Sequence, residues 1–431
     1  MSGKRPAAPA DSSGAGGGFR AYWALVALVL GLALGASAGA WPESARSGAL
    51  AVAGFVGTLW LNALKMTVIP LVIALLVVGI AKSREAALGG RIAGKSVVWI
   101  VVICTISSIF GAVLTLLLTR AFPLSRGTAH ALQGALAGVQ QKSGGPLPGI
   151  AVFFRGVIPD NVFAAATNGD ILPLVIFSLL FALALGAISD KGRASVVTLF
   201  EAIGDALLVI IAWVLWIAPL GVLALAFTVG SAAGGSAFAG LGHYVVVISV
   251  IGVLVTLAAY PLAMTFGRIG LGAFTRALIP PQAVAISTRS SLASLPAMLA
   301  AARELRVQEE VADVALPISV ALFRATGPAM NTAVAFYIAH WLALEPSLGQ
   351  MIAATAVGAL MSYGAVSLPG EVTYISSIAP IALALGVPVA PLGLLVAVEM
   401  IPDIFRTIGN VTMDVAVTAV VDRSVREGEE S

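Results

Sequence analysis

The chain of 431 residues is 59% hydrophobic and only 10% charged, with a formal net charge of +3. Soluble domains typically have about a quarter of their residues charged, so this composition excludes a soluble globular protein and indicates a polytopic membrane protein. The basic residues lie between apolar runs, and the single cysteine and three scattered histidines have no disulfide partner or metal-ligand spacing, so nucleic-acid partners, redox chemistry and a resident cofactor are not expected.

The N-terminal residues 1–20 are rich in Gly, Ala, Ser and Pro, which predicts a disordered cytoplasmic tail. The following apolar run, 21–41, is long enough to cross a bilayer as a helix. Its Ala-Ser-Ala triplet also resembles a signal-peptide cleavage site. Because further spans follow at once, we predict an uncleaved first transmembrane helix.

Five more apolar runs complete a set of six predicted spans. They lie at about 49–81, 97–122, 171–188, 196–229 and 243–267. With the N-terminus inside, the loops on the cytoplasmic side would contain most of the basic residues. We therefore predict a multi-pass protein with both termini in the cytoplasm.

After residue 267 the apolar segments are interrupted by Pro, Gly and Ser. The segment 278–304 has three prolines around a Ser- and Thr-rich stretch, and 361–386 is interrupted at SLPGE; full spans are predicted at about 311–342 and 396–421. The order is thus hairpin, helix, hairpin, helix. Paired interrupted segments are typical of secondary transporters, whose binding sites lie near the middle of the membrane.

The last predicted span contains five polar residues, Glu399, Asp403, Arg406, Asn410 and Asp414. Their spacing confines them to an arc of roughly 80° on one helix face. An ionisable residue at the bilayer centre costs about 2.5–3.5 kcal/mol, so the stripe either joins helices through hydrogen bonds or binds a ligand. Arg offers a planar fork for a carboxylate and Asp can hold an ammonium group, which favours a site for an amino acid with an extra carboxylate.

The segment DIFRTIGNVTMD, 403–414, resembles the last helix of the glutamate transporter family, the dicarboxylate/amino acid:cation symporters, with its pattern D-x-x-R-T-x-x-N-x-x-x-D. The resemblance is collinear from about residue 20 to 423. Further matching segments are STRSSLASLP (287–296), SLPGE (367–371), ALKMTVIPLVIALLVVGI (63–80), GVIPDNVFAAATNGDILPLVIF (156–177) and APLGVLALAF (218–227).

The resemblance implies an all-α membrane protein with a glutamate-transporter-like fold of eight transmembrane helices and two re-entrant hairpins. Residues 21–267 would form helices 1–6 as scaffold and frame, 268–423 the transport core, and 424–431 a cytoplasmic C-terminal tail. It also implies a homotrimer in the lipid bilayer of a bacterial inner membrane. Its ligand would be a small anionic substrate.

The resemblance also implies roles for single residues. Arg406 would bind the side-chain carboxylate of the substrate and Asp403 its amino group. The remaining pocket residues would be Ser290, Ser291, Thr407 and Asn410, with Ser367, Pro369 and Gly370 at the outer gate. Dicarboxylate carriers of the family usually lack the aspartate, so Asp403 favours aspartate or glutamate as the substrate.

One departure concerns the cation sites. The Asn-Met-Asp-Gly-Thr motif of sodium-coupled members falls here on Phe323, Arg324, Ala325, Thr326 and Gly327. Sodium prefers several oxygen ligands near a negative charge, whereas this segment offers a phenyl ring and a cation. Residual sodium-site positions remain at Asn410, Asp414, Ser107 and Ser108. No metal site is predicted with these residues alone, and coupling to Na+ is doubtful.

A proton is the alternative coupling ion, because burial disfavours the charged form of a carboxyl group. Arg324 either replaces sodium electrostatically beside Asp414 or the hairpin backbone, or pairs with Glu371 or Glu399. Arg289 either pairs with Asp403 or Asp414 in an empty site or extends to the cytoplasmic surface. The coupling candidates are therefore Arg289, Arg324, Glu371, Glu399 and Asp414.

These features predict a secondary active symporter for acidic amino acids that works by elevator-type alternating access and is proton-coupled or sodium-independent. A C4-dicarboxylate symporter is the alternative within this class. An anion channel, a non-transporting substrate sensor and a degenerate relative are the alternatives outside it. An enzyme is not expected, because the hairpin serines have no nearby histidine and no phosphate-binding loop is present.

Overall fold

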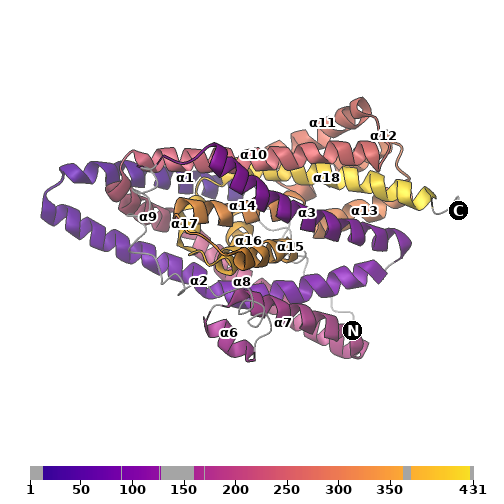
Figure 1. Cartoon of the computed structure of the whole chain (residues 1–431), viewed down its shortest axis with the longest axis horizontal. Helices are drawn as coiled ribbons and strands as arrows, with labels where there is room; N and C mark the ends of the chain where they lie inside the picture. Colours follow the sequence, from indigo (N-terminus) through magenta and orange to yellow (C-terminus); the bar gives the residue numbers. More distant parts are fainter. Residues whose placement is uncertain are drawn as a thin grey trace, which may run out of the picture.

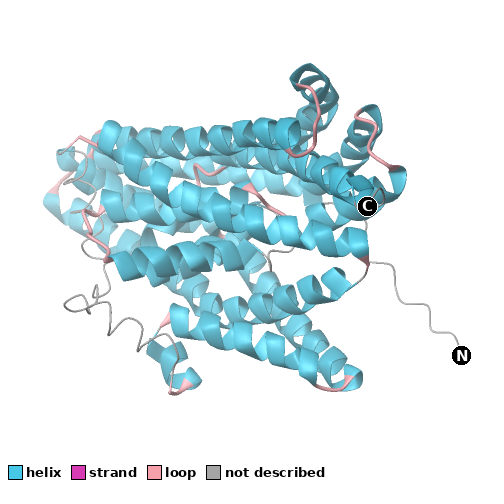
Figure 2. Cartoon of the chain, turned by 45° about the vertical axis from the view of Figure 1, so that its right-hand side comes forward, coloured by secondary structure: helices cyan, strands magenta, loops and turns pink. Residues whose placement is uncertain are grey.

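The computed structural model describes residues 13–88, 90–125, 127, 160–168, 170–362 and 370–427, and the regular elements in these ranges are all helices (Figure 1 and Figure 2). This confirms the all-helical prediction. Seven helical segments within these ranges are long and apolar enough to cross a membrane. They are Tyr22–Ala40, Glu43–Lys82, Arg91–Ala121, Asp190–Trp216, Ser236–Thr265, Glu309–Trp341 and Met400–Glu427.

The first part of the chain forms the helices before residue 267. These are α1 (Ser13–Ser37), α2 (Glu43–Leu88), α3 (Arg91–Ala121), α6 (Val162–Asn168), α7 (Ile171–Ala184), α8 (Asp190–Trp216), α9 (Ala218–Ala233) and α10 (Ser236–Thr265), with single 3-10 turns at Ala38–Ala40 and Leu185–Ala187. Helix α1 begins at Ser13 rather than at residue 21. The predicted span 196–229 divides at Ile217, because Pro219 starts a new helix.

One predicted span is shorter than expected. The run 171–188 contains α7, which has 14 residues, and then a 3-10 turn. A helix of that length covers roughly 21 Å, which is less than the hydrocarbon core of a bilayer. The apolar composition of α7 therefore does not indicate a helix that crosses the whole bilayer.

The second part of the chain forms the remaining helices. These are α11 (Leu271–Thr288), α12 (Ser291–Glu304), α13 (Glu309–Leu322), α14 (Thr326–Trp341), α15 (Leu348–Ser362), α16 (Gly370–Leu385), α17 (Ala390–Leu395) and α18 (Met400–Glu427). Helices α11 and α12 pack against each other as one hairpin, and α15 and α16 as another. The predicted span 311–342 corresponds to the apolar segment Glu309–Trp341, whose helix is interrupted between Leu322 and Thr326.

The first hairpin turns within the predicted Ser- and Thr-rich stretch, and both hairpins have longer helices than the sequence predicts. The first turns at Arg289, whose left-handed backbone (φ 50°) ends α11, whereas Pro280 and Pro281 lie inside α11. Transmembrane helices tolerate internal prolines because neighbouring groups re-satisfy the freed carbonyls. The second hairpin begins at Leu348, well before residue 361, because its first arm is an uninterrupted apolar helix.

The helices form two packing groups. Helices α1, α2, α7, α8 and α9 pack mainly among themselves, whereas α3 packs against α14 and α15, and α10 against α18 and α14. Helices α3 and α14 approach very closely, since a Cβ added to Gly111 would meet the backbone of Ala329. Small residues permit such contacts between membrane helices. Two helices from before residue 267 thus lie with the elements that follow it.

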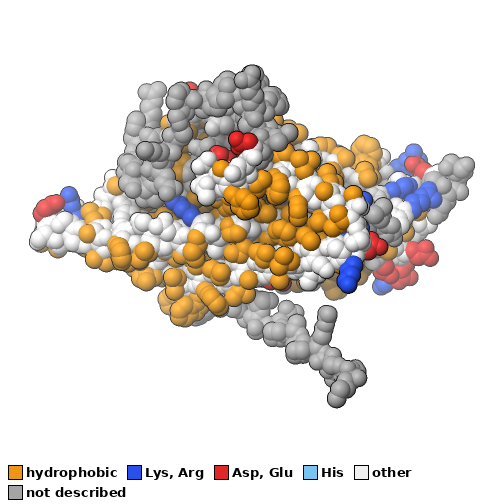
Figure 3. All heavy atoms as spheres, turned by 90° about the horizontal axis from the view of Figure 1, so that it is seen from below, with side chains coloured by type: hydrophobic (Ala, Val, Ile, Leu, Met, Phe, Trp, Pro, Cys, Tyr) orange, Lys and Arg blue, Asp and Glu red, His pale blue; other side chains and the backbone are white. Residues whose placement is uncertain are grey.

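The surface has the polarity expected of a membrane protein. Figure 3 shows a face largely covered by hydrophobic side chains, with charged side chains gathered chiefly at its right-hand end. Trp213 and Trp216, at the end of α8, are 68% and 69% exposed. Because lipid replaces water around such side chains, this exposure is stable only in a bilayer or detergent.

Candidate functional site

The polar stripe of α18 lies inside the protein. Glu399, Asp403, Arg406, Asn410 and Asp414 are each no more than 8% exposed. Helix α18 packs against α10, α11, α13, α12 and α3, so these neighbours cover the stripe. The stripe therefore faces other protein elements rather than lipid.

The start of α18 fixes two of these carboxylates. Glu399 directly precedes the helix, and its carbonyl accepts a hydrogen bond from the backbone N–H of Asp403 at 2.9 Å. Pro402 lies in the first turn, where the missing N–H costs nothing. Glu399, Asp403 and Arg406 consequently follow one another around the first turns of a rigid helix.

Arg406 lies between two carboxylates. Its Nη2 is 2.6 Å from Oε1 of Glu399, and its Nη1 is 3.5 Å from Oδ1 of Asp403. The shorter contact is a close ion pair without hydrogen-bond alignment, so Nε and Nη2 donate no hydrogen bond to any residue in the described ranges. A carboxylate ligand could bind Nε and Nη2 through two parallel N–H groups by taking the place of Oε1 of Glu399.

Asp403 also contacts the turn of the first hairpin. Its Oδ2 is 3.8 Å from Nη1 of Arg289, which is the residue with the left-handed backbone. Both oxygens of Asp403 thus face a guanidinium. The sequence left two alternatives for Arg289, pairing with an aspartate of the last span or extending to the surface. The structure shows the pairing with Asp403.

The hairpin turn supplies a helix N-terminus. The hydroxyl of Ser290 caps α12 by accepting a hydrogen bond from the N–H of Ala293 at 3.2 Å, and Ser291 is the first residue of the helix. Unpaired N–H groups and the positive end of the helix dipole favour an anion at such a position. Because Arg289 next to the cap reaches Asp403, the cap and the start of α18 lie on the same side of the bundle.

Thr407 and Asn410 are buried but already bonded. Thr407 donates its hydroxyl to the carbonyl of Asp403 at 2.9 Å. Oδ1 of Asn410 accepts from the N–H of Thr326 at 3.0 Å and lies 2.5 Å from the Thr326 hydroxyl, which also contacts the carbonyl of Arg406. Asn410 therefore holds the broken helix pair α13–α14 against α18.

Other predicted residues have different outcomes. Ser367 and Pro369 lie outside the described residues, as does the side chain of Glu371, and Gly370 is the first residue of α16. Ser107 donates its hydroxyl to the carbonyl of Ala325. The outer gate thus stays a prediction, and Ser107 links α3 to the break in the α13–α14 pair.

Two further predicted residues, Ser108 and Asp414, are fully buried. Ser108 donates to the carbonyl of Thr355 at 2.7 Å and lies 2.9 Å from the Thr332 hydroxyl, so it links helices. Asp414 is fully buried, and within the described ranges neither of its carboxylate oxygens receives a hydrogen bond. Arg324, from the break before α14, interacts electrostatically with it.

Sequence reasoning missed two tyrosines of the site. The hydroxyl of Tyr244, on α10, donates to Oε2 of Glu399 at 2.9 Å and lies 3.0 Å from the hydroxyl of Tyr374, on α16. Both rings are no more than 1% exposed. Buried tyrosine hydroxyls usually find a partner, so a tyrosine in an otherwise aliphatic span was the available signal.

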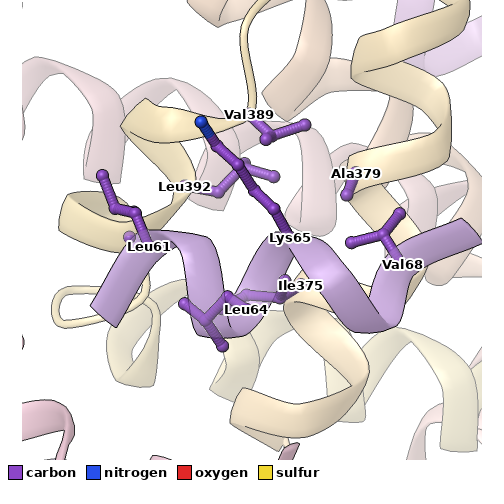
Figure 4. Close-up of a pocket in the computed structure, with 9 residues that line it drawn as sticks. Leu61, Leu64, Lys65, Val68, Ile375, Ala379, Val389 and Leu392 are labelled. Atoms are coloured by element: carbon purple, nitrogen blue, oxygen red, sulfur yellow. The ribbon is translucent and has the colours of Figure 1, made fainter. Parts of the chain in front are cut away.

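A separate small pocket lies between the two packing groups. Lys65 of α2 is half-buried beside it, with α16 and α17 on the opposite side (Figure 4). The other lining residues are Leu61, Leu64, Val68, Ile375, Ala379, Val389, Leu392 and Gly393. None of the predicted substrate residues lines this pocket, so it is an apolar gap between helices rather than the substrate site.

The chain is similar to known transport proteins over nearly its whole length. A model of the Sodium:dicarboxylate symporter family matches residues 21–424. A C4-dicarboxylate transport protein of Laribacter hongkongensis is 28% identical over 374 residues, covering 85% of this chain and 82% of the relative. A proton/sodium-glutamate symport protein of Bacillus caldotenax is 27% identical over 402 residues, with 91% of each chain covered. A proton/glutamate-aspartate symporter of Escherichia coli is 26% identical over 415 residues, covering 93% and 92%.

Proposed function

Because the chain belongs to the sodium:dicarboxylate symporter family, we propose that it is a secondary active symporter for an acidic amino acid, aspartate or glutamate. The family is one of transporters, which confirms both the resemblance of the motifs and the expectation that the protein is not an enzyme. Relatives named for glutamate and aspartate support the substrate class. The observation that carries the proposal is the buried pair of Arg406 and Asp403 beside a capped helix N-terminus.

Each charged group of the substrate has a partner in this arrangement. The side-chain carboxylate would be bound by Nε and Nη2 of Arg406, which have no hydrogen bond to a described residue. The ammonium group would be held by Asp403, and the α-carboxylate by the N-terminus of α12 at Ser290 and Ser291. Thr407 and Asn410 would complete the wall next to Arg406.

A C4-dicarboxylate is the second candidate substrate, and one observation favours it. Asp403 faces both Arg289 and Arg406, so its negative charge is already balanced before an ammonium group arrives. Relatives named as C4-dicarboxylate transport proteins agree with this alternative. Competition between aspartate and succinate for binding to the purified protein separates the two, since the true substrate competes more strongly.

Coupling to a proton rather than to sodium is supported by how the remaining oxygens are used. Oδ1 of Asn410 accepts from the N–H of Thr326 and lies 2.5 Å from its hydroxyl, so this oxygen already serves two groups of the protein. A sodium ion would need several free oxygens in place of its water shell. With Arg324 also present in this region, we infer that sodium is dispensable.

Movement of one packing group past the other would provide alternating access. The contact between α2 and the helices α16 and α17 is apolar, and the pocket beside Lys65 shows that it is not tightly filled (Figure 4). Helices α3 and α10 would move with the hairpins, because they pack against α14 and α18. Such an interface can slide at little cost, as elevator transport requires.

The protein is a multi-pass membrane protein, and we propose that it forms a homotrimer in a bacterial inner membrane with both termini in the cytoplasm. Uptake of labelled aspartate into proteoliposomes tests the function. Binding without concentrative uptake would instead indicate a sensor, and uptake without saturation an anion channel.

A further inference from the structure

Glu399 lies at the centre of a buried polar chain that joins three helices. One of its oxygens contacts Arg406 at 2.6 Å, and the other accepts the hydrogen bond from Tyr244 at 2.9 Å. The hydroxyl of Tyr374 lies 3.0 Å from that of Tyr244. Arg406 on α18 is thus linked through Glu399 and Tyr244 to Tyr374 on α16, the second helix of the second hairpin.

The charged and titratable groups that act on Glu399 come from each helix packed around it. Within the described ranges they are Arg406 and Asp403 on α18, Tyr244 on α10 and Tyr374 on α16, while Arg289 and Arg324 act on Asp403. The cluster of Arg289, Arg324, Arg406, Glu399, Asp403 and Asp414 has three cations and three carboxylates when all are ionised. The empty site is therefore close to neutral, and an anionic substrate adds an unbalanced charge.

Resting on the proposed symport function, we propose that Glu399 is the proton-binding residue, and that Tyr244 and Tyr374 are positioning residues that hold it in both protonation states. In the empty site, Oε1 of Glu399 contacts Nη2 of Arg406. A substrate carboxylate that binds Nε and Nη2 of Arg406 would take the place of this oxygen. Two carboxylates on one guanidinium repel each other, so substrate binding drives protonation of Glu399. A proton from water adds to the carboxylate, and the reverse step releases it with the substrate on the other side.

The tyrosine pair suits both states of Glu399. With Glu399 ionised, Tyr374 donates to Tyr244, and Tyr244 donates to Oε2. With Oε2 protonated, each bond turns round, so that Glu399 donates to Tyr244 and Tyr244 to Tyr374. A hydroxyl is both donor and acceptor, so neither state leaves the buried carboxyl without its bond to Tyr244. A lysine side chain at these positions has no acceptor and could not reverse in this way.

Asp414 is the main rival within the described residues. It is also fully buried, but no hydrogen bond from a described residue reaches either of its oxygens, and Arg406 is not among the groups that act on it. Protonation of Asp414 is therefore not tied directly to the substrate carboxylate. Glu399 shares a guanidinium with the substrate, which gives the two binding events the direct coupling that symport requires.

The test is proton uptake on substrate binding. Purified full-length protein is titrated with aspartate in weakly buffered, sodium-free choline solution, and the proton release or uptake is followed with a pH indicator between about pH 5.5 and 8.5, where aspartate carboxylates stay ionised. Wild-type protein should take up about one proton per aspartate bound, so its affinity should fall about tenfold per pH unit on the alkaline side. Glu399→Gln should bind with no proton uptake and a flat pH profile.

Matched variants separate positioning from folding. Tyr244→Phe removes a donor to the ionised carboxylate, so it should move the pH midpoint of binding to higher pH while proton uptake persists. Two control variants should behave as wild type. Tyr260→Phe changes a tyrosine of the same helix, and Glu201→Gln changes a carboxylate that pairs with Lys82 at 2.7 Å. Unchanged proton uptake in Glu399→Gln, or its loss in Asp414→Asn instead, overturns the proposal. If wild-type protein binds aspartate without proton uptake, the role of Glu399 is refuted but the proposed symport function stands. If it binds neither aspartate nor succinate, the proposed function itself is refuted.

Discussion

Oε1 of Glu399 lies 2.6 Å from Nη2 of Arg406, so the arginine predicted to bind substrate already contacts a carboxylate of its own chain. This contact balances the charge of the buried guanidinium when no substrate is bound. Without such a partner, burying the arginine would be costly. The candidate site thus contains an internal anion next to Arg406.

The first prediction concerns the fork of Arg406. Arg406→Lys keeps the charge but removes the two parallel donors, so the affinity for aspartate should fall at least tenfold, or about 1.4 kcal/mol. Isothermal titration of the purified protein measures it. Arg423→Lys near the C-terminal end of α18, where Arg423 pairs with Glu427, is the matched control. Equal affinities for both variants and wild type would exclude Arg406 from the substrate site.

The second prediction separates the two substrate classes at Asp403. Asp403→Asn removes the anion that would hold an ammonium group, so aspartate affinity should fall more than tenfold while succinate affinity stays equal or rises. Competition binding with both ligands on the same preparation gives the ratio. A fall for succinate as large as that for aspartate would show that Asp403 acts by orienting Arg289 and Arg406 instead.

The third prediction concerns sodium. Because the Asn410 oxygen is bound by Thr326, aspartate affinity in sodium and in choline should agree within a factor of about three, well under the tenfold that 1.4 kcal/mol of coupling gives. Binding titrations in the two salts at equal ionic strength measure this. A tenfold or larger gain in sodium would mean that other oxygens rebuild a cation site.

The fourth prediction tests the sliding interface. A Cβ added to Gly393 on α17 would lie 2.6 Å from Leu61 and 3.1 Å from Trp60 of α2. Gly393→Val should therefore slow uptake into proteoliposomes several-fold while leaving aspartate binding near wild type, because it obstructs relative movement and not the site. Gly54→Val on α2, where the added group meets nothing within 4 Å, serves as the control.

Equal uptake by the Gly393 and Gly54 variants would argue that α2 and α17 do not move past each other. Loss of both binding and uptake in the Gly393 variant alone would show that the contact supports folding instead. Thermal unfolding of the detergent-solubilised protein distinguishes that case from a slowed transporter. The two readouts together therefore assign the contact to motion or to stability.

The sequence by itself determined the helical membrane class and the polar stripe of the last span, because hydrophobicity and the 3.6-residue period are local properties. The altered helix-seven motif also pointed to the region of Phe323 and Arg324, where the helix breaks. The sequence also placed the first hairpin at the Ser- and Thr-rich stretch 287–296, where the chain turns, although Pro280 and Pro281 are accommodated inside α11. Arg289 and Ser290 within this stretch form the turn.

Only the tertiary structure decided which side chains meet. Tyr244 reaches Glu399 across 155 residues of sequence, and Thr326 reaches Asn410 across 84. No periodicity encodes these contacts, because they depend on the packing and rotation of separate helices against one another. For the same reason α3 and α10, similar in composition to the other early spans, lie with the hairpins and α18 rather than with α1 and α2. The local sequence determines which face each helix can bury, and the packing of the bundle determines which neighbouring helix covers that face.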